Sequence, residues 1–304
     1  MIPVVASSLL LVDGFSPHAA GLRAAFDDRF RDPRVADGGR FVWDYWHVPG
    51  QYTLLRTPAY LFFPRKVYEA FHRQLVHFGR RTLGCHDISP TWLSCYVDGC
   101  RQELHGDLPH GPFAFVFSLT NWKKRAFRGG ETLMLRDDVL DYWESFESVR
   151  SIEERDIVRE IEPRFNRLTV FDPRVPHGVR RVEGTHDPRE GRLVVHGWFV
   201  QPRPFIEGPV PAPALAKKTA ELLARMPSLL RDVEPAGVLS LSLSVATSGE
   251  VTAVKLLCDT LRVVQRDERE KKRFVRELSA VLKRWTFAPA RAASHITFPL
   301  VFER

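Results

Sequence analysis

Five short apolar segments separated by turns place the strongest constraint on how this chain can fold. Each is rich in β-branched or aromatic residues and is bounded by Gly, Pro, Asp or Asn. The segments are TWLSCYV (91–97), FAFVFSLT (113–120), ETLMLR (131–136), RLTVFD (167–172) and RLVVHGWFV (192–200). Short strands at this spacing are typical of a β-sandwich or β-barrel. The sequence therefore predicts a β-rich core between residues 90 and 200.

Helical patterns precede this core. Residues 16–30 open with Ser16 and Pro17, and apolar side chains then recur at helical spacing. Residues 65–81 repeat the pattern, which stops near Gly84. We expect two helices that support the core, with strands and loops in the aromatic stretch between them. The charged stretch 136–164, which interrupts the core, favours a helical or loop insertion.

The C-terminal third has a different organisation. Five prolines fall between residues 202 and 213, which favours an extended connector over a packed element. Residues 233–304 then show a strand, a turn at Ser248–Gly249, a second strand, an amphipathic helix and a final strand. The predicted domains are therefore residues 1–200, a proline-rich connector at 201–232, and a small αβ domain at 233–304.

Composition narrows the classes of protein that fit. No run of 18 apolar residues occurs, so we expect no membrane span, and the apolar start (1–17) suits a buried strand better than a secretory signal. The four cysteines form no CxxC pair, which favours a reducing, cytoplasmic location. The net charge of +7 comes without basic motifs interleaved with aromatics, so no nucleic-acid partner is expected.

A polar turn inside the core, QELHGDLPHG (102–111), holds candidate metal ligands. His105 and Asp107 share one face if the segment is extended, although two surface polar residues in a loop would give the same pattern. His177, which follows a strand and a proline-containing turn, is the best-placed third ligand. These three residues would form a 2-His-1-carboxylate set for non-haem Fe(II), with positions left open for a bidentate co-substrate and O₂.

An arginine at the start of an apolar strand suggests an anion anchor. Alternation places Arg192, Val194, His196 and Trp198 on one face of the strand. A buried, unpaired charge is expensive, and a bound carboxylate would satisfy it through a bidentate salt bridge. The alternative is a strand-end arginine that reaches solvent. His196 either lines the same pocket or is a satisfied core histidine.

The motifs YVDGCRQELHGD, FAFVFSLTNW, FRGGETLML, RLTVFDPRVPHGV and RLVVHGWF resemble, in order and spacing, those of the 2-oxoglutarate- and Fe(II)-dependent oxygenases. The prolyl 4-hydroxylase-like branch is the most similar. The resemblance covers residues 90–200 and implies a double-stranded β-helix (jelly-roll) core. It also implies Fe(II), 2-oxoglutarate and O₂ as cofactors, iron bound by His105, Asp107 and His177, and Arg192 at the distal carboxylate of 2-oxoglutarate. Tyr96 and Trp198 match further positions of the family pattern.

Two questions stay open at this point. The interval from His177 to Arg192 is longer than the family pattern, so Arg180 and Arg181 are rival anchors, although the step from Arg192 to Trp198 favours Arg192. The resemblance implies hydroxylation of a peptide or protein residue such as proline. The alternatives are a free amino acid or small metabolite as the substrate, or a barrel that binds without catalysis.

The C-terminal segment resembles a second family, the TonB C-terminal-type αβ module. The resemblance rests on GVLSLSLSVATSGEVTAVKLL, FVRELSAVLKRWTFAPA and ITFPLVFE. It implies that Trp285 and Phe287 pack against the sheet. We expect this module to dock a protein partner.

Overall fold

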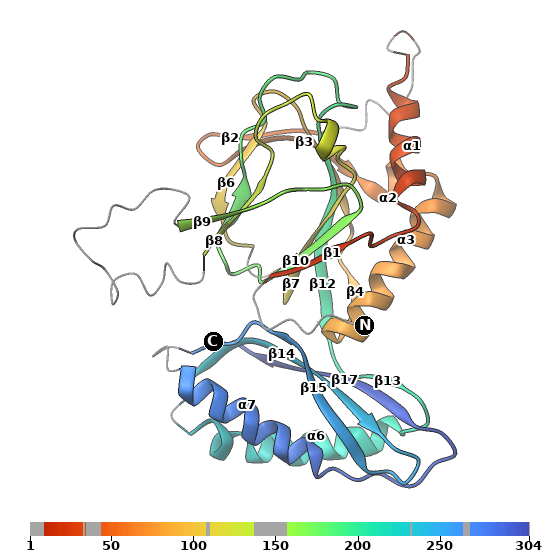
Figure 1. Ribbon diagram of the computed structural model, residues 1–304, viewed down its shortest axis with the longest axis vertical. Helices are drawn as coiled ribbons and strands as arrows, with labels where there is room; N and C mark the ends of the chain where they lie inside the picture. The colour runs from red at the N-terminus through yellow and green to blue at the C-terminus, as the bar shows by residue number, and fades with distance from the viewer. Residues whose placement is uncertain are drawn as a thin grey trace, which may run out of the picture. The chain divides into compact units, whose positions relative to one another are not determined.

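The computed structural model describes residues 9–32, 34, 44–107, 110–136, 157–231, 233–263 and 268–303. These residues divide into two compact units, each described by itself (Figure 1). The large unit holds residues 9–75 and 88–199, and the small unit holds residues 76–87 and 200–303. Most of the stretch 136–164, predicted as a helical or loop insertion, lies outside the described residues, but its end forms a strand, Val158–Ile161.

One antiparallel sheet dominates the large unit. Its order is β1-β10-β7-β12-β5-β3-β6-β11-β8-β9, with β2 paired to β3 and β4 to β12. The five predicted segments form β5, β7, β8, β10 and β12. The strands are β1 (Leu9–Asp13), β2 (Asp44–Val48), β3 (Tyr52–Pro58), β4 (Cys85–Ile88), β5 (Trp92–Tyr96), β6 (Arg101–His105), β7 (Phe113–Ser118), β8 (Thr132–Leu135), β9 (Val158–Ile161), β10 (Arg167–Phe171), β11 (His177–Val179) and β12 (Arg192–Pro202).

The sheet is strongly curled. Met134 and Ile161, from β8 and β9 at one end of the strand order, lie in one apolar cluster with Leu9, Ala114 and Phe171 from the other end. Such a cluster forms only if the two ends of the sheet turn toward each other. The curl creates an interior face, which every second residue of each strand supplies.

Helices cover the outside of this sheet. The two predicted helices are α1 (Ala19–Arg29) and α3 (Arg65–Phe78), which bury Leu22, Phe26, Phe71 and Leu75. The aromatic stretch between them forms β2 and β3 as expected, and also a short helix, α2 (Ala59–Phe62). A π-helical turn, η2 (Gly79–Leu83), follows α3 and ends at Gly84, whose φ of +73° requires glycine. A 3₁₀ turn, η3 (Trp122–Lys124), follows β7.

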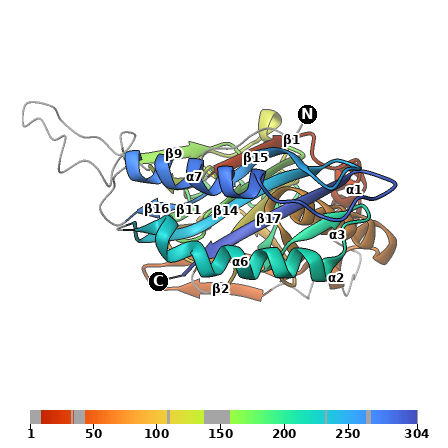
Figure 2. The ribbon, with the colours of Figure 1, turned by 90° about the horizontal axis from the view of Figure 1, so that it is seen from below.

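The small unit is a sheet with two helices on one face (Figures 1 and 2). Its strand order is β13-β17-β14-β15, with β16 paired to β14. The repeat LSLSLS in β14 turns Leu239, Leu241 and Leu243 toward α6 and α7, where Trp285 and Phe287 complete the core. The elements are β13 (Phe205–Glu207), α6 (Ala212–Leu230), β14 (Pro235–Val245), β15 (Val251–Asp259), β16 (Arg262–Val263), α7 (Glu268–Lys283) and β17 (Ser294–Phe302).

The prediction of an extended connector at 201–232 is wrong. Strand β13 pairs with β17, and α6 runs as a 19-residue helix through most of this stretch. Proline fits here because Pro211 precedes the helix and Pro213 lies in its first turn, where no intrahelical N–H bond is lost. The apolar positions Leu215, Leu222 and Met226 are buried in the small-unit core, and this burial outweighs the proline content.

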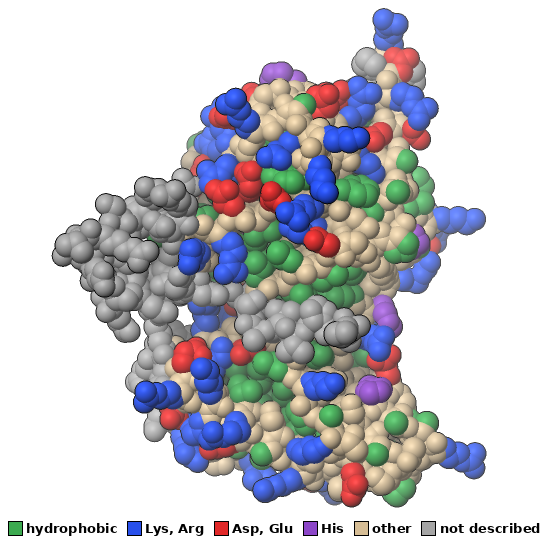
Figure 3. All heavy atoms as spheres, viewed as in Figure 1, with side chains coloured by type: hydrophobic (Ala, Val, Ile, Leu, Met, Phe, Trp, Pro, Cys, Tyr) green, Lys and Arg blue, Asp and Glu red, His purple; other side chains and the backbone are tan. Residues whose placement is uncertain are grey.

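No helix of the described residues is long and apolar enough to cross a membrane. Basic and acidic side chains are interspersed over the face of the large unit that Figure 3 shows. On that face, the positive net charge is therefore not gathered into one basic surface.

Candidate active site

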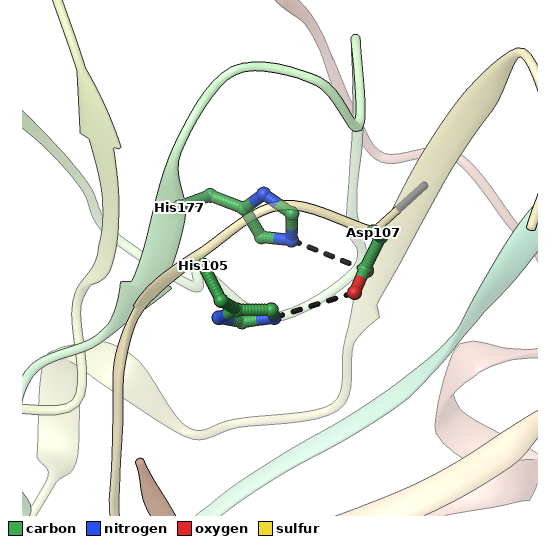
Figure 4. Close-up of side chains that lie close together, drawn as sticks. All are labelled: His105, Asp107 and His177. Carbon is green, nitrogen blue, oxygen red and sulfur yellow. Dashed lines mark hydrogen bonds and ion pairs between the residues drawn. The ribbon is translucent and has the colours of Figure 1, made fainter. Parts of the chain in front are cut away.

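Three predicted ligands, His105, Asp107 and His177, converge inside the curled sheet (Figure 4). His105 ends β6, His177 begins β11, and the two residues are partners in the antiparallel register of these strands. Their Nε2 atoms lie 3.4 and 3.3 Å from the two carboxylate oxygens of Asp107. All three ligand atoms lie within 4.8 Å of one another. Two strands, and a residue two positions beyond the end of one of them, thus supply two nitrogens and one oxygen to a single point.

Backbone carbonyls fix how both imidazoles are presented. The Nδ1 atom of His105 lies 2.8 Å from the carbonyl oxygen of Glu103, and that of His177 lies 2.9 Å from the carbonyl oxygen of Val175. A carbonyl can only accept, so each Nδ1 carries the proton and donates. Each Nε2 is then the atom left to bind a metal. Outer hydrogen bonds of this kind orient the histidine ligands of metal sites.

The turn between β10 and β11 positions two of the three ligands. Asp172 is fully buried and accepts hydrogen bonds from the backbone N–H and the guanidinium of Arg174. Within this turn, the carbonyl of Pro173 accepts the backbone N–H of Asp107 at 3.0 Å, and the carbonyl of Val175 holds His177. One closed turn therefore sets the position of Asp107 and the ring orientation of His177.

The protonation of the cluster reflects these contacts. Burial by itself would raise the pKa of Asp107, but hydrogen bonds from His105 and His177 hold it well below its usual range. Burial opposes the charged form of His105, yet its hydrogen bonds to Asp107 and to the Glu103 carbonyl raise its pKa above the ordinary value. An anionic carboxylate between two imidazoles is a site that a cation can occupy in place of a proton.

The donor set fits non-haem Fe(II). Two imidazole nitrogens and one carboxylate oxygen form the facial set that leaves three positions of an octahedral ion to other ligands. Among the described residues, this group of three is the one that could hold a metal ion. The protein side of the site thus leaves room for a co-substrate and O₂.

Arg192 is a buried cation on the same interior face of the sheet. It is 1% exposed, and its Nη2 donates to the hydroxyl of Thr132 at 3.0 Å. Its guanidinium carbon lies 4.6 Å from the ring centroid of Tyr96, its register partner on β5. Its Nε and Nη1 have no hydrogen-bond partner among the described residues. Burial lowers the pKa of Arg192, which is the signature of a charge that lacks full compensation.

The GGET turn, residues 129–132, packs beside the side chain of Arg192. Gly129 and Gly130 have φ of +73° and +81°, which side chains rarely adopt. A Cβ on Gly129 would come within 1.8 Å of the carbonyl oxygen of Arg181, so only glycine allows this close approach. The turn leads directly into Thr132, whose contact with Arg192 was not predicted from the sequence.

The rival arginines have other surroundings. Arg180 is one-third exposed and pairs with Glu160 at 2.6 Å and with Glu131 at 3.7 Å. Arg181 is more than half exposed and lies 3.8 Å from Glu183. Neither side chain is buried in the way that Arg192 is.

The other predicted site residues share the face of Arg192. Tyr96 is buried, and its hydroxyl donates to Gln102 at 3.4 Å. His196 lies 2.8 Å from the hydroxyl of Ser94 through its Nε2. The ring centroids of Trp198 and His110 lie 4.5 Å apart in a tilted arrangement, and the buried Nε1 of Trp198 has no hydrogen-bond partner among the described residues. The alternation expected for β12 therefore holds in the structure.

Comparison with known proteins assigns this part of the chain. Residues 91–200 match the family model described as the 2OG-Fe(II) oxygenase superfamily. The chain contains a 2OG-Fe(II) oxygenase domain. The matched segment includes the three converging residues and Arg192. No curated protein sequence matches the chain.

The solved structures that match the chain include two prolyl hydroxylases. A prolyl-4-hydroxylase of Pseudomonas putida is 17% identical, with a TM-score of 0.43, and the match covers 64% of this chain and 92% of that one. HygX of Streptomyces hygroscopicus, solved with nickel and 2-oxoglutarate, is 14% identical with a TM-score of 0.41, covering 63% and 82% of the two chains. A viral collagen prolyl hydroxylase of Paramecium Bursaria Chlorella virus-1 is 13% identical with a TM-score of 0.40, covering 64% and 96%. The assignment rests on the family model.

The oxygenase assignment accounts for the main features of the large unit. The protein is an oxygenase that uses Fe(II), 2-oxoglutarate and O₂. Its mixed α/β architecture with a strongly curled antiparallel sheet is consistent with a jelly-roll oxygenase core.

Proposed function

We propose that this oxygenase hydroxylates a C–H bond, with His105, Asp107 and His177 as the Fe(II) ligands and Arg192 as the anchor of 2-oxoglutarate. The observation that carries the proposal is the buried guanidinium of Arg192, with two nitrogens, Nε and Nη1, that lack hydrogen-bond partners among the described residues. Leaving such a charge uncompensated is expensive, and a carboxylate supplies both the opposite charge and the acceptors. Arg180, which is partly exposed, and Arg181, which is exposed, are both ion-paired and have no comparable requirement.

Arg192, on β12, and the proposed ligands, on and beside β6 and β11, lie on the interior side of the same curled sheet. A dicarboxylate held at Arg192 by one end can therefore direct its other end toward the three ligands. Thr132 and Tyr96 orient Arg192 for this task, one by a hydrogen bond and the other by its ring face.

When bound, Fe(II) and 2-oxoglutarate activate O₂, so that one oxygen atom enters the substrate as hydroxyl and 2-oxoglutarate becomes succinate and CO₂. The chain itself holds the ligands, and the carbonyls of Glu103 and Val175 accept the Nδ1 protons of the two imidazoles, so that each Nε2 is the nitrogen that would bind the metal. Buried side chains around Tyr96 and Phe171 line this interior.

We propose a residue of a peptide or protein, such as proline, as the substrate, with a free amino acid or small metabolite as the alternative. Two observations support a macromolecule. The aromatic stretch before the core exposes Tyr45 and Tyr60, which suits a contact rim. The small unit has its own core, which suits a docking module related to the TonB C-terminal type. We also place the protein in the cytoplasm, in keeping with its four buried cysteines, none of which forms a disulfide.

An anaerobic titration tests the core of the proposal. Fe(II) and 2-oxoglutarate added to the full-length protein should give a metal-to-ligand charge-transfer band, and Arg192→Ala should shift its appearance to higher 2-oxoglutarate. Aerobic incubation with a peptide pool and with a small-metabolite pool then identifies the substrate by a mass gain of one oxygen atom. A product in the small-metabolite pool alone would replace the peptidyl assignment with the alternative.

A further inference from the structure

A glutamine on β6, Gln102, bridges two parts of the proposed active site. Its side-chain amide nitrogen lies 3.2 Å from the Nε2 of His105, and its amide oxygen accepts the hydroxyl of Tyr96 at 3.4 Å. The ring of Tyr96 in turn faces the guanidinium of Arg192, whose carbon lies 4.6 Å from the ring centroid. Gln102 therefore lies between a proposed metal ligand and the residue that contacts the proposed anchor of 2-oxoglutarate.

An irregularity in the pairing of β6 with β11 brings Gln102 to this position. His105 is paired with His177 and Gln102 with Val179, so three steps along β6 stand opposite two steps along β11. In a regular strand, residues three apart point to opposite faces, and the extra residue of a bulge re-aims one of them. A Cβ on Gly178 would lie 2.4 Å from the carbonyl oxygen of Gln102, so glycine permits this close approach. The bulge thus places Gln102 and His105 on one side of the strand.

The contact with His105 occupies the atom that would bind the metal. Because the Nδ1 of His105 donates to the carbonyl of Glu103, its Nε2 is an acceptor, and the amide of Gln102 donates to it. This nitrogen has one lone pair, so it cannot accept the amide N–H and bind a metal at the same time. Metal binding must therefore separate the amide of Gln102 from His105.

The released amide needs a new acceptor. Gln102 is half-buried, and a donor that loses its acceptor in such a place costs free energy. Among the described residues, His105 is the one acceptor of this amide nitrogen. The keto-acid end of 2-oxoglutarate carries carboxylate and keto oxygens, and a hydrogen bond to a carboxylate is stronger than one to a neutral group. Such an acceptor would arrive at the metal itself, next to the nitrogen that the amide has left.

We propose that Gln102 binds 2-oxoglutarate, with its side-chain amide donating to an oxygen of the keto-acid end once a metal occupies Nε2 of His105. This inference rests on the proposed function, in which Arg192 binds the distal carboxylate. Gln102 therefore acts on the two ligands in opposite directions. Its amide competes with the metal for His105, and it favours the co-substrate that binds after the metal.

Two calorimetric titrations of the full-length protein separate these effects. Mn(II), a redox-stable probe, is titrated first, and 2-oxoglutarate is then titrated into the Mn(II)-loaded protein. Gln102→Leu removes the amide at similar size, and Gln102→Glu keeps the shape but replaces the N–H donor by a negative charge. The matched control is Gln51→Leu, an exposed glutamine in the turn before β3.

We expect Gln102→Leu to weaken 2-oxoglutarate binding by about 10- to 100-fold, because a hydrogen bond to a charged acceptor is lost. Mn(II) affinity should stay at the wild-type value or rise by up to about tenfold, because the competing hydrogen bond to His105 is removed. Gln102→Glu should weaken 2-oxoglutarate binding at least as much, since like charges repel, and should bind Mn(II) no less tightly than the wild type. Gln51→Leu should change neither affinity.

The opposite signs distinguish this role from a structural one. A loss of Mn(II) affinity in either Gln102 variant, through misfolding or a distorted site, would overturn the inference, as would wild-type affinity for 2-oxoglutarate in Gln102→Leu. If Gln102→Leu changed only the stimulation of succinate release by a hydroxylated substrate, the amide would belong to the substrate site instead. Failure of the wild-type protein to bind Mn(II) and 2-oxoglutarate would overturn the proposed function, and the role of Gln102 with it.

Discussion

His105 and His177 are register partners on neighbouring antiparallel strands, and both direct Nε2 at the carboxylate of Asp107. The pairing of β6 with β11 sets the distance between the two imidazoles, so the three ligand atoms come together without a rearrangement of the loop that carries Asp107.

The first prediction concerns the metal. His105→Ala, Asp107→Ala and His177→Ala should each weaken Fe(II) binding by about 100-fold or more, since changing a residue that only supports a metal ligand already costs about 10- to 100-fold.

Calorimetric titration with Mn(II), a redox-stable probe, measures this loss under oxygen. The exposed His186→Ala serves as the control and should bind the metal as the wild type does. Wild-type affinity in any of the three variants would contradict the assignment of that ligand.

Metal affinity should depend on pH through the same cluster. The pKa of His105 is raised and that of Asp107 is lowered, so near neutral pH the carboxylate is charged and the imidazole gains a proton as the pH falls. The contact between them stabilises the metal-free fold below the raised pKa of His105 and above the lowered pKa of Asp107. A metal must displace that proton, so affinity should fall by about tenfold per pH unit once His105 is protonated. Titrations between pH 8 and pH 6 would show a flat profile if no proton is displaced.

Arg192→Ala should raise the 2-oxoglutarate concentration required for half-maximal succinate release by roughly 10- to 100-fold, because a buried charge-assisted pair is lost. Arg180→Ala and Arg181→Ala remove charges that are already paired and partly exposed, and should change it by less than about threefold. A larger effect from either of these two variants would identify that arginine, and not Arg192, as the residue that binds 2-oxoglutarate.

The chain carries a matched pair of Asp-Pro-Arg turns that isolates the role of Asp172. Asp172 and Asp187 each accept hydrogen bonds from the backbone and guanidinium of the arginine two residues on. Only the first turn contacts Asp107 and His177. Asp172→Ala should therefore weaken metal binding by about 10- to 100-fold, while Asp187→Ala should leave it unchanged. An equal loss of metal affinity in both variants would mean that Asp172 acts only through the overall stability of the protein. Urea unfolding of both variants measures their loss of stability.

Truncation near Pro202 should reduce the stability of the remaining chain. Within the small unit, the segment 76–87 depends on the C-terminal strands: Ser240 donates to the carbonyl of Leu83 and Thr297 to that of Arg81. Pro299 also packs against Gly84. We expect a lower yield of folded protein, and a chain truncated at this point that unfolds at the wild-type urea concentration would contradict this dependence.

The sequence alone determined the local structure of this protein and the residue types of its site. Alternation and turn residues predicted the strands of the core, helical spacing predicted α1, α3 and α7, and the order of polar motifs singled out His105, Asp107, His177 and Arg192. These features depend on residues that are close in the sequence, because strand and helix periodicities extend over a few positions. The same local reasoning failed at α6, where buried apolar contacts outweigh the proline content.

Only the tertiary structure decided which distant residues meet. The contact of Thr132 with Arg192, the support of Asp107 by the turn at Asp172, and the placement of Arg56 between Trp46 and Trp92 all depend on strand order and register. No single strand carries a signal for its partner, since the partner is chosen when the curled sheet buries its interior face as a whole. The residue types of the site can therefore be predicted from the sequence, whereas their arrangement in space is set by the fold.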